Sequence, residues 1–165
     1  MVSSTLSLID RPCSTSRLRT SSAVVATAKS KYPFKNTDME LVEVAKSVLK
    51  NAYAPYSGFR VAAVVKTKSG RIYTGVNVEN ASYGLTMCAE RVAVFKAVSE
   101  GDREIDTVVV YTDTEEPVAP CGACRQVIAE FNPNARIVMA SRTKVEEASL
   151  RDLLPKAFSR ENLLR

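Results

Sequence analysis

Residues 86–91 read Thr-Met-Cys-Ala-Glu-Arg, and residues 120–126 read Pro-Cys-Gly-Ala-Cys-Arg-Gln. Each stretch opens a segment that we predict to be a helix, and together they hold three of the four cysteines of the chain. The free N–H groups and the dipole of a helix N-terminus favour a thiolate over a thiol. We therefore predict that Cys88, Cys121 and Cys124 meet at one metal ion, with the carboxylate of Glu90 beside it.

The cysteine spacing favours a catalytic zinc site over a structural one. Cys121 and Cys124 are one helical turn apart and share one helix face. The chain has no histidine, and its remaining cysteine, Cys13, lies in a segment of different composition. Structural zinc sites are closed by four protein ligands, whereas catalytic sites have three and keep one position for water. We predict one catalytic Zn²⁺ per chain, because a redox pair at Cys121 and Cys124 would leave Cys88 unexplained.

Two arginines and one acid follow the ligand motifs directly. Three thiolates on Zn²⁺ leave a net negative charge, which Arg91 and Arg125 can offset by hydrogen bonds to the sulfurs. The alternative is that both arginines face solvent. Glu90 is close enough to share the site without coordinating the metal. Its alternative is an ordinary acid in the first turn of a helix.

The first 36 residues differ from the rest of the chain. They contain twelve Ser or Thr, six basic residues and one acid, whereas residues 37–165 contain 17 basic and 17 acidic residues. Such a segment is typical of an organelle transit peptide or a disordered tail. We expect residues 1–36 to be a disordered or targeting extension and residues 37–165 to be one catalytic domain. The expected compartment is the cytoplasm, unless residues 1–36 direct the chain to an organelle.

Charge, hydropathy and cysteine content argue against several classes of partner and setting. A neutral body argues against binding to a nucleic acid polymer, which needs a basic surface. No apolar run approaches the ~20 residues that a membrane helix requires. Few, asymmetrically spaced cysteines and no secretory segment indicate a reducing compartment.

The apolar periodicity predicts an α/β domain. Thr37 and Glu40 have the spacing of a capping box at the start of the first helix. The expected elements are a helix at 37–51, a hairpin of strands 61–67 and 71–78, a helix at 88–100, a strand at 105–112, a helix at 120–131, strands at 135–140 and 145–149, a helical turn at 150–154 and a polar tail. Pro120 is expected in the first turn of its helix. The later strands alternate with helices, which implies right-handed parallel crossovers. We predict a mixed sheet of five strands between helical layers.

The helix at 88–100 is apolar nearly all round. Such a helix is buried within the protein or within an oligomer interface.

These residues resemble the zinc nucleoside deaminases in their all-cysteine form, and most closely the small homotetrameric cytidine deaminases. Cys88-Ala89-Glu90 and Pro120-Cys121-x-x-Cys124 carry the metal signature, and residues 54–59, 75–81, 88–91 and 153–158 match further motifs. The resemblance covers roughly residues 37–160. It implies the three-layer α/β/α fold of the family, with an initial antiparallel hairpin.

The resemblance also implies an activity. This is the hydrolysis of cytidine and deoxycytidine to uridine and deoxyuridine plus ammonia in pyrimidine salvage, with Glu90 passing protons between water, ring and leaving amine. The implied substrate-binding residues are Phe59, Asn77, Val78, Glu79, Tyr83, Ala89 and Phe158.

The family assigns roles to several of these positions. Phe59 would stack on the pyrimidine, and Asn77 and Glu79 would bind the ribose hydroxyls. These two residues alternate along a strand end, so their side chains should point to one side. Tyr83 and Phe158 would reach the site from neighbouring subunits of a homotetramer with shared active sites.

Three other functions remain open at this point. One is a deaminase of another cytosine compound, such as the related blasticidin S deaminases. The second is a polynucleotide deaminase, and the third is a structural zinc module that binds a partner. The chain departs from the family pattern at Gly58 and at Arg60, where related sequences often carry Pro, and Arg60 puts a charge beside Phe59.

Overall fold

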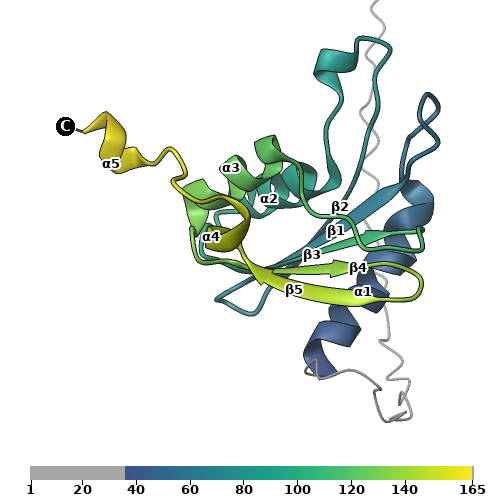
Figure 1. Ribbon diagram of the computed structural model, residues 1–165, viewed down its shortest axis with the longest axis horizontal. Helices are drawn as coiled ribbons and strands as arrows, with labels where there is room; N and C mark the ends of the chain where they lie inside the picture. The colour runs from purple at the N-terminus through teal and green to yellow at the C-terminus, as the bar shows by residue number, and fades with distance from the viewer. Residues whose placement is uncertain (1–35, 165) are drawn as a thin grey trace, which may run out of the picture.

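A computed structural model describes residues 36–164, which form a five-stranded sheet between two helical layers (Figure 1). The strands are β1 (Val61–Thr67), β2 (Ile72–Val76), β3 (Ile105–Thr112), β4 (Arg136–Ala140) and β5 (Val145–Ser149), in the order β2-β1-β3-β4-β5. The helices are α1 (Asn36–Val48), α2 (Ala89–Ser99), α3 (Gly122–Phe131), α4 (Leu150–Leu153) and α5 (Arg160–Leu163), with short 3₁₀ turns η1 (Leu49–Asn51) and η2 (Tyr83–Leu85). The predicted three-layer α/β/α architecture is confirmed. The extension predicted for residues 1–36 lies outside the described residues, apart from Asn36.

The strand directions follow from the connections between them. β1 and β2 pair antiparallel, as the predicted hairpin requires, and β1 also pairs antiparallel with β3. β3 and β4 pair parallel, because the chain crosses between them through α3. The expectation of parallel crossovers does not extend to β5, which pairs antiparallel with β4. The tight turn at residues 141–144, closed by the bond from Ser141 N to Lys144 O (2.8 Å), leaves no room for a helix.

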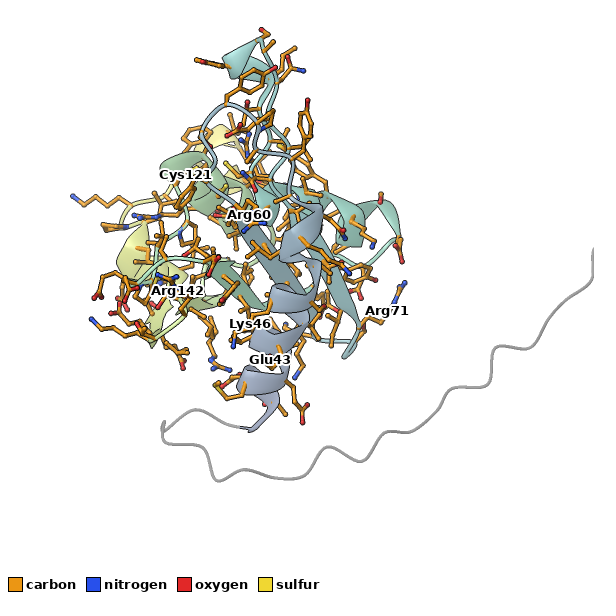
Figure 2. The ribbon with its side chains drawn as sticks, turned by 90° about the vertical axis from the view of Figure 1, so that its right-hand side faces the viewer. Glu43, Lys46, Arg60, Arg71, Cys121 and Arg142 are labelled. Atoms are coloured by element: carbon orange, nitrogen blue, oxygen red, sulfur yellow. The ribbon has the colours of Figure 1, made fainter. Side chains whose placement is uncertain are left out.

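Both faces of the sheet are buried, each under its own helices. Ala62 and Val64 of β1 pack with the inner side of α1, while Ala63 and Val65 pack under α2 and α3. Burial on two faces explains why β1 is a continuous apolar run instead of an alternating one. The outer side of α1 is polar and carries the ion pair between Glu43 and Lys46 (Figure 2).

The first helix begins two residues earlier than the capping box predicts, because Thr37 as N-cap would make Asp38 the first helical residue. It starts at Asn36, so Thr37 lies inside α1 and the predicted N-cap is wrong. Asp38, only 3% exposed, instead accepts a hydrogen bond from Arg136 Nη2 at 2.9 Å. Arg136 also binds Glu147, and the hydrogen bonds to Glu147 and Asp38 raise its pKa. This ion-pair group anchors the first turn of α1 to β4 and β5.

Strand β2 is shorter than predicted because an asparagine side chain takes over its pairing. Asn77 N donates to Val61 O at 3.1 Å, as in a ladder. Val61 N, however, donates to Asn77 Oδ1 at 2.9 Å, while Asn77 O accepts from Tyr53 N at 3.0 Å. The ladder therefore ends at Val76, and the chain beyond it pairs with the loop at residues 52–60.

The C-terminal segment is more ordered than the predicted polar tail. It contains α5, which begins with a capping box between Ser159 and Asn162. Within residues 36–164, no helix has the length and apolar character needed to cross a membrane.

Gly75 of β2 lies directly against the backbone of α2. A Cβ placed at Gly75 would be 2.5 Å from Ala93 N and 3.0 Å from Val92 Cβ, and closer still to Ala89 O. Backbone atoms cannot rotate away, so a side chain here would force α2 off the sheet.

We expect Gly75→Ala to lower the free energy of unfolding by about 3 kcal/mol, because it overpacks a backbone contact. Urea unfolding of the zinc-loaded protein measures this. The control is Gly84→Ala, where no atom lies within 4 Å of the added Cβ, with an expected change of about 0.5 kcal/mol or less. Equal stability of the two variants would contradict the close approach of α2 to β2.

Candidate metal centre and active site

The three predicted ligands converge at the N-termini of two helices. Cys88 is the N-cap of α2, Cys121 is the N-cap of α3, and Cys124 lies in the first turn of α3. The Sγ atoms of Cys121 and Cys124 are 3.5 Å apart, those of Cys88 and Cys121 are 3.9 Å apart, and all three lie within 4.8 Å of one another. Two sulfurs bound at ~2.3 Å to a tetrahedral zinc lie about 3.8 Å apart. The sulfur geometry therefore fits zinc.

The residue before the second ligand has a different place than predicted. Pro120 precedes the N-cap Cys121 and does not belong to the first turn of α3. Arg125 Nε donates to Pro120 O at 2.6 Å, and Arg125 Nη1 donates to Leu153 O at 2.7 Å. In the structure Arg125 thus bonds two backbone carbonyls instead of the sulfurs expected from the sequence. It positions the chain that leads into Cys121.

The pKa values of two of the thiols are shifted in opposite directions. A hydrogen bond from Cys124, helped by Arg91, lowers the pKa of Cys88 to about 5. The pKa of Cys124 is raised, because its thiol is the donor in that bond and is buried. Zinc is bound by thiolates, so Cys124 must release a proton when the metal binds.

Arg91 is the cation next to this sulfur group. Its Nη2 lies 3.5 Å from Cys88 Sγ and 3.4 Å from Thr86 O. The Nε of Arg91 is buried and has no hydrogen-bond partner among the described residues. A metal-bound thiolate accepts hydrogen bonds and supplies the acceptor that this buried donor lacks. The site thus fits zinc on charge as well as on geometry, and Arg91 is not a solvent-facing residue.

Glu90 is buried beside the sulfurs. It is 4% exposed and lies in the first turn of α2. Burial raises the pKa of Glu90, and the negative charge of Cys88 adds to the rise. An acid that served only the helix dipole could remain in water, so the burial of Glu90 favours a place in the site over this alternative.

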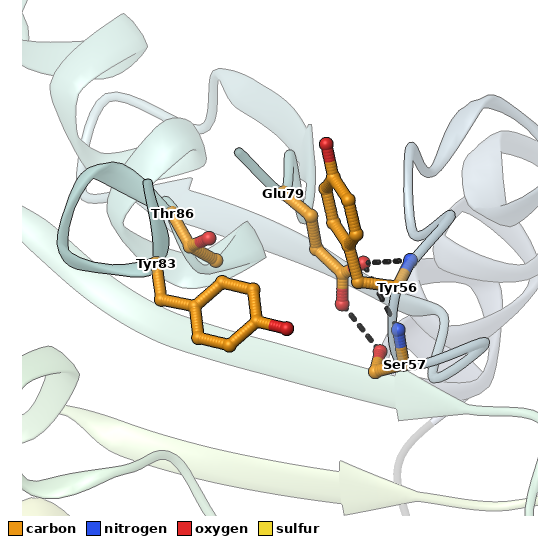
Figure 3. A pocket seen from close by; sticks show the side chains of 5 residues that line it. All are labelled: Tyr56, Ser57, Glu79, Tyr83 and Thr86. Carbon is orange, nitrogen blue, oxygen red and sulfur yellow. Dashed lines mark hydrogen bonds between the residues drawn. The ribbon is translucent and has the colours of Figure 1, made fainter. Parts of the chain in front are cut away.

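A cavity of about 360 Å³ is lined by Tyr56, Ser57, Glu79, Tyr83 and Thr86 (Figure 3). Glu79 accepts hydrogen bonds from Tyr56 N (2.9 Å), Ser57 N (3.2 Å) and the Ser57 hydroxyl. The bond from the Ser57 hydroxyl, with the two backbone N–H groups, lowers the pKa of Glu79. Thr86 joins the cavity to the sulfur group, because its carbonyl accepts from Arg91.

The remaining predicted residues lie around this cavity or behind it. Asn77 is buried, and its Nδ2 donates to Phe59 O at 2.8 Å, while the Phe59 ring is 41% exposed. Val78 pairs through its backbone with Tyr53 and Met87. Tyr83 stands on the projecting loop that carries η2 (Figure 1), and its ring meets the Tyr56 ring edge-on at 6.0 Å.

Ala89 and Phe158 differ most in their exposure. Ala89 is fully buried in the core. Phe158 is 59% exposed, and its carbonyl accepts from Gln126 at 2.7 Å.

Tyr56, Ser57 and Thr86 lie within the motifs of the sequence, but no role in the site was predicted for them. The available signal for the first two was the turn at residues 55–58 immediately before Phe59. Gly58 has φ +68, a left-handed conformation that suits glycine, and its N–H donates to Ala54 O at 3.0 Å. This turn directs two backbone N–H groups at Glu79.

Comparisons with known proteins agree with this geometry. Residues 35–141 match the family model of the cytidine and deoxycytidylate deaminase zinc-binding region. A cytidine deaminase from Sporosarcina psychrophila is 48% identical over 126 residues, covering 75% of this chain and 93% of the relative. The crystal structure of a cytidine deaminase from Burkholderia pseudomallei has a TM-score of 0.70 at 47% identity, covering 73% of this chain and 98% of that chain. A blasticidin-S deaminase from Bacillus cereus is 32% identical over 131 residues, covering 74% of this chain and 93% of the relative.

We expect Cys124→Ser to reduce bound zinc from one ion per chain to about a tenth of that value or less, because a buried thiolate ligand is lost. Metal analysis by inductively coupled plasma mass spectrometry on dialysed protein measures the content. Cys13→Ser is the matched control and should keep full zinc. Full zinc in Cys124→Ser would remove Cys124 from the ligand set.

Proposed function

The chain belongs to the cytidine and deoxycytidylate deaminase family, and from this premise we propose how its own residues carry out the reaction. The reaction is the zinc-dependent hydrolysis of cytidine or deoxycytidine to uridine or deoxyuridine and ammonia. The observation that supports our assignment best is the buried Glu90 beside three convergent sulfurs. Zinc, when bound by Cys88, Cys121 and Cys124, lowers the pKa of a water molecule and so supplies a nucleophile near neutral pH.

Glu90 is the group that moves protons. Its raised pKa brings it closer to neutral pH, where one group can both accept and donate a proton. Glu90 takes a proton from the attacking water and delivers it to N3 of the pyrimidine as the C4–O bond forms. The remaining proton of the new C4 hydroxyl then passes through Glu90 to the amino group. The C4–N bond breaks, ammonia leaves, and C4 becomes a carbonyl carbon.

Phe59, Asn77 and Glu79 bind the nucleoside. The half-exposed ring of Phe59 offers a surface on which the pyrimidine can stack. Three protein donors occupy Glu79, and an ionised carboxylate accepts about four hydrogen bonds, so one position remains for a sugar hydroxyl. A single hydroxyl contact does not require a 2′-hydroxyl, which supports turnover of both cytidine and deoxycytidine. Val78 through its side chain and Ala89 through its backbone complete the substrate-binding set.

Two arginines, Arg91 and Arg125, support the sulfur group from outside the set of metal ligands. Arg91 offsets the charge of the thiolates directly, through its contact with Cys88. Arg125 acts indirectly, by holding Pro120 O and therefore the approach to Cys121. Arg91 would reduce the excess negative charge of three thiolates that hold zinc, whereas Arg125 would fix the position of Cys121.

Four copies of the chain form a homotetramer with shared active sites. Three observations support this assembly. Phe95, a large apolar residue of α2, is 45% exposed. Tyr83 and Phe158 are also exposed, although their rings are large and apolar. Contact between copies would bury these rings and bring Tyr83 and Phe158 to a neighbour's cavity. The cytoplasm remains the expected compartment, with residues 1–36 as a tail or transit peptide.

Glu90→Gln should keep one zinc per chain and lower kcat for cytidine by about a thousandfold or more, because the amide cannot transfer a proton. The loss of cytidine absorbance in the ultraviolet measures turnover, and metal analysis measures zinc. Glu100→Gln, at the far end of the same helix, should leave both unchanged. Near-normal turnover in Glu90→Gln would refute the proton-transfer role.

The same assay separates the proposed substrates from the alternative. The wild-type protein should deaminate cytidine and deoxycytidine with kcat/KM values at least about a hundredfold above that for blasticidin S, a difference of roughly 3 kcal/mol. A higher value for blasticidin S would instead support the second candidate. That candidate is kept because a blasticidin-S deaminase is also similar to the chain.

Phe95→Glu should lower the mass of the assembly below four chains, because a charge would be buried in the subunit contact. Sedimentation velocity at micromolar concentration measures the mass. Ile72→Glu, at an exposed apolar position on β2, is the matched control and should leave the assembly intact. A wild-type protein that sediments as one chain would overturn the tetramer.

A further inference from the structure

We propose that Ser57 is a positioning residue that couples sugar recognition at Glu79 to base stacking at Phe59. This inference rests on the proposed function, in which Glu79 binds the sugar and Phe59 the pyrimidine. The Ser57 hydroxyl donates to Glu79 Oε1 and accepts from Phe59 N at 3.0 Å. One hydroxyl thus joins the two groups that bind opposite ends of the nucleoside. Figure 3 shows its bond to Glu79.

The two bonds of this hydroxyl reinforce each other. A hydroxyl has one donor and two acceptor positions, so it can bridge a carboxylate and an N–H group at the same time. Donation to the charged Glu79 polarises the hydroxyl and makes its oxygen a better acceptor for Phe59 N. A sugar hydroxyl that orients Glu79 therefore also acts on the backbone of Phe59.

Phe59 is held at both of its backbone polar groups by side chains. Its N–H donates to Ser57 Oγ, and its carbonyl accepts from Asn77 Nδ2 at 2.8 Å. Both of these side chains are tied in turn to the sugar-binding part of the site, because Asn77 belongs to it and Ser57 contacts Glu79. The backbone position from which the Phe59 ring projects is thus held by the residues that bind the sugar.

The fold of the loop does not depend on the Ser57 hydroxyl. Gly58 N bonds Ala54 O at 3.0 Å, and Glu79 N bonds Tyr53 O at 2.8 Å. The N–H groups of Tyr56 and Ser57 also continue to bind Glu79 Oε2 when the hydroxyl is removed. Removing the hydroxyl alone should leave the loop in place while freeing Glu79 Oε1 and Phe59 N.

Ser57→Ala should raise KM for cytidine about tenfold to a hundredfold, the effect expected for one hydrogen bond to a charged group. We expect kcat to change by about threefold or less, because Glu90 and the sulfurs make no contact with Ser57. Steady-state assays on the zinc-loaded full chain measure both values. Ser57→Thr, which keeps the hydroxyl, should restore KM, and Ser99→Ala on the surface of α2 is the control for loss of a serine hydroxyl.

A double-mutant cycle tests whether Ser57 acts through Glu79. In a Glu79→Ala background, Ser57→Ala should raise KM by about twofold or less, because the bridge is already broken. The positioning role would be overturned by an equal rise in KM in both backgrounds or by an unchanged KM in Ser57→Ala. It would also be overturned if Ser57→Ala bound less zinc or had a lower melting temperature. If the wild-type protein does not deaminate cytidine at all, the proposed function fails. If the wild-type protein is active and the Ser57→Ala variant has the same KM, only the positioning role fails.

Discussion

The backbone contact between Gly75 and α2 sets the relative position of the two halves of the site. Gly75 lies two residues before Asn77 and four before Glu79, the proposed sugar-binding pair. Its nearest neighbour across the contact, Ala89, lies between Cys88 and Glu90. Since main-chain atoms meet here without an intervening side chain, the distance between the sugar-binding and the proton-transfer residues is fixed by the packing of a strand on a helix. Contacts between flexible side chains alone would not fix this distance so closely.

The sulfur group depends on a second feature of the same layer, the meeting of the N-termini of α2 and α3. Both helices lie on one face of the sheet (Figure 1), and both begin with a cysteine as N-cap. Helix dipoles and N–H groups therefore favour thiolates at the place where the sulfurs meet. Three thiolates bring more negative charge than one zinc ion neutralises, and Arg91 lies where this excess arises. The Nε of Arg91, which is buried and has no partner among residues 36–164, is a further donor at the same place.

The sequence predicts most of the fold and the metal ligands, but not how the substrate residues are held. The limits of β1 and β3 agree with the predicted strands, because β-branched runs between turns carry a strong local signal. The limits of β5 also agree, although Val145 is its one β-branched residue. The three cysteine ligands are predicted by elimination, because the chain has no histidine that could serve as a ligand. The early end of β2 does not follow, since it depends on Asn77 Oδ1 replacing a backbone carbonyl. The burial of Asp38 against Arg136 and the role of Ser57 likewise depend on contacts between distant segments, which periodicity does not report.

A chain without histidine has no side chain whose ordinary pKa lies near neutrality, so proton transfer at neutral pH requires a shifted group. The structure holds two carboxylates in opposite environments. Glu90 is buried near a thiolate, which raises its pKa, and Glu79 accepts three hydrogen bonds, which lower its pKa. The first environment suits a group that must gain and lose a proton, and the second suits one that must stay ionised to accept a hydroxyl. The burial of Glu90 therefore suits it to the proposed acid–base role, and the hydrogen bonds from the loop around Ser57 favour the ionised form of Glu79.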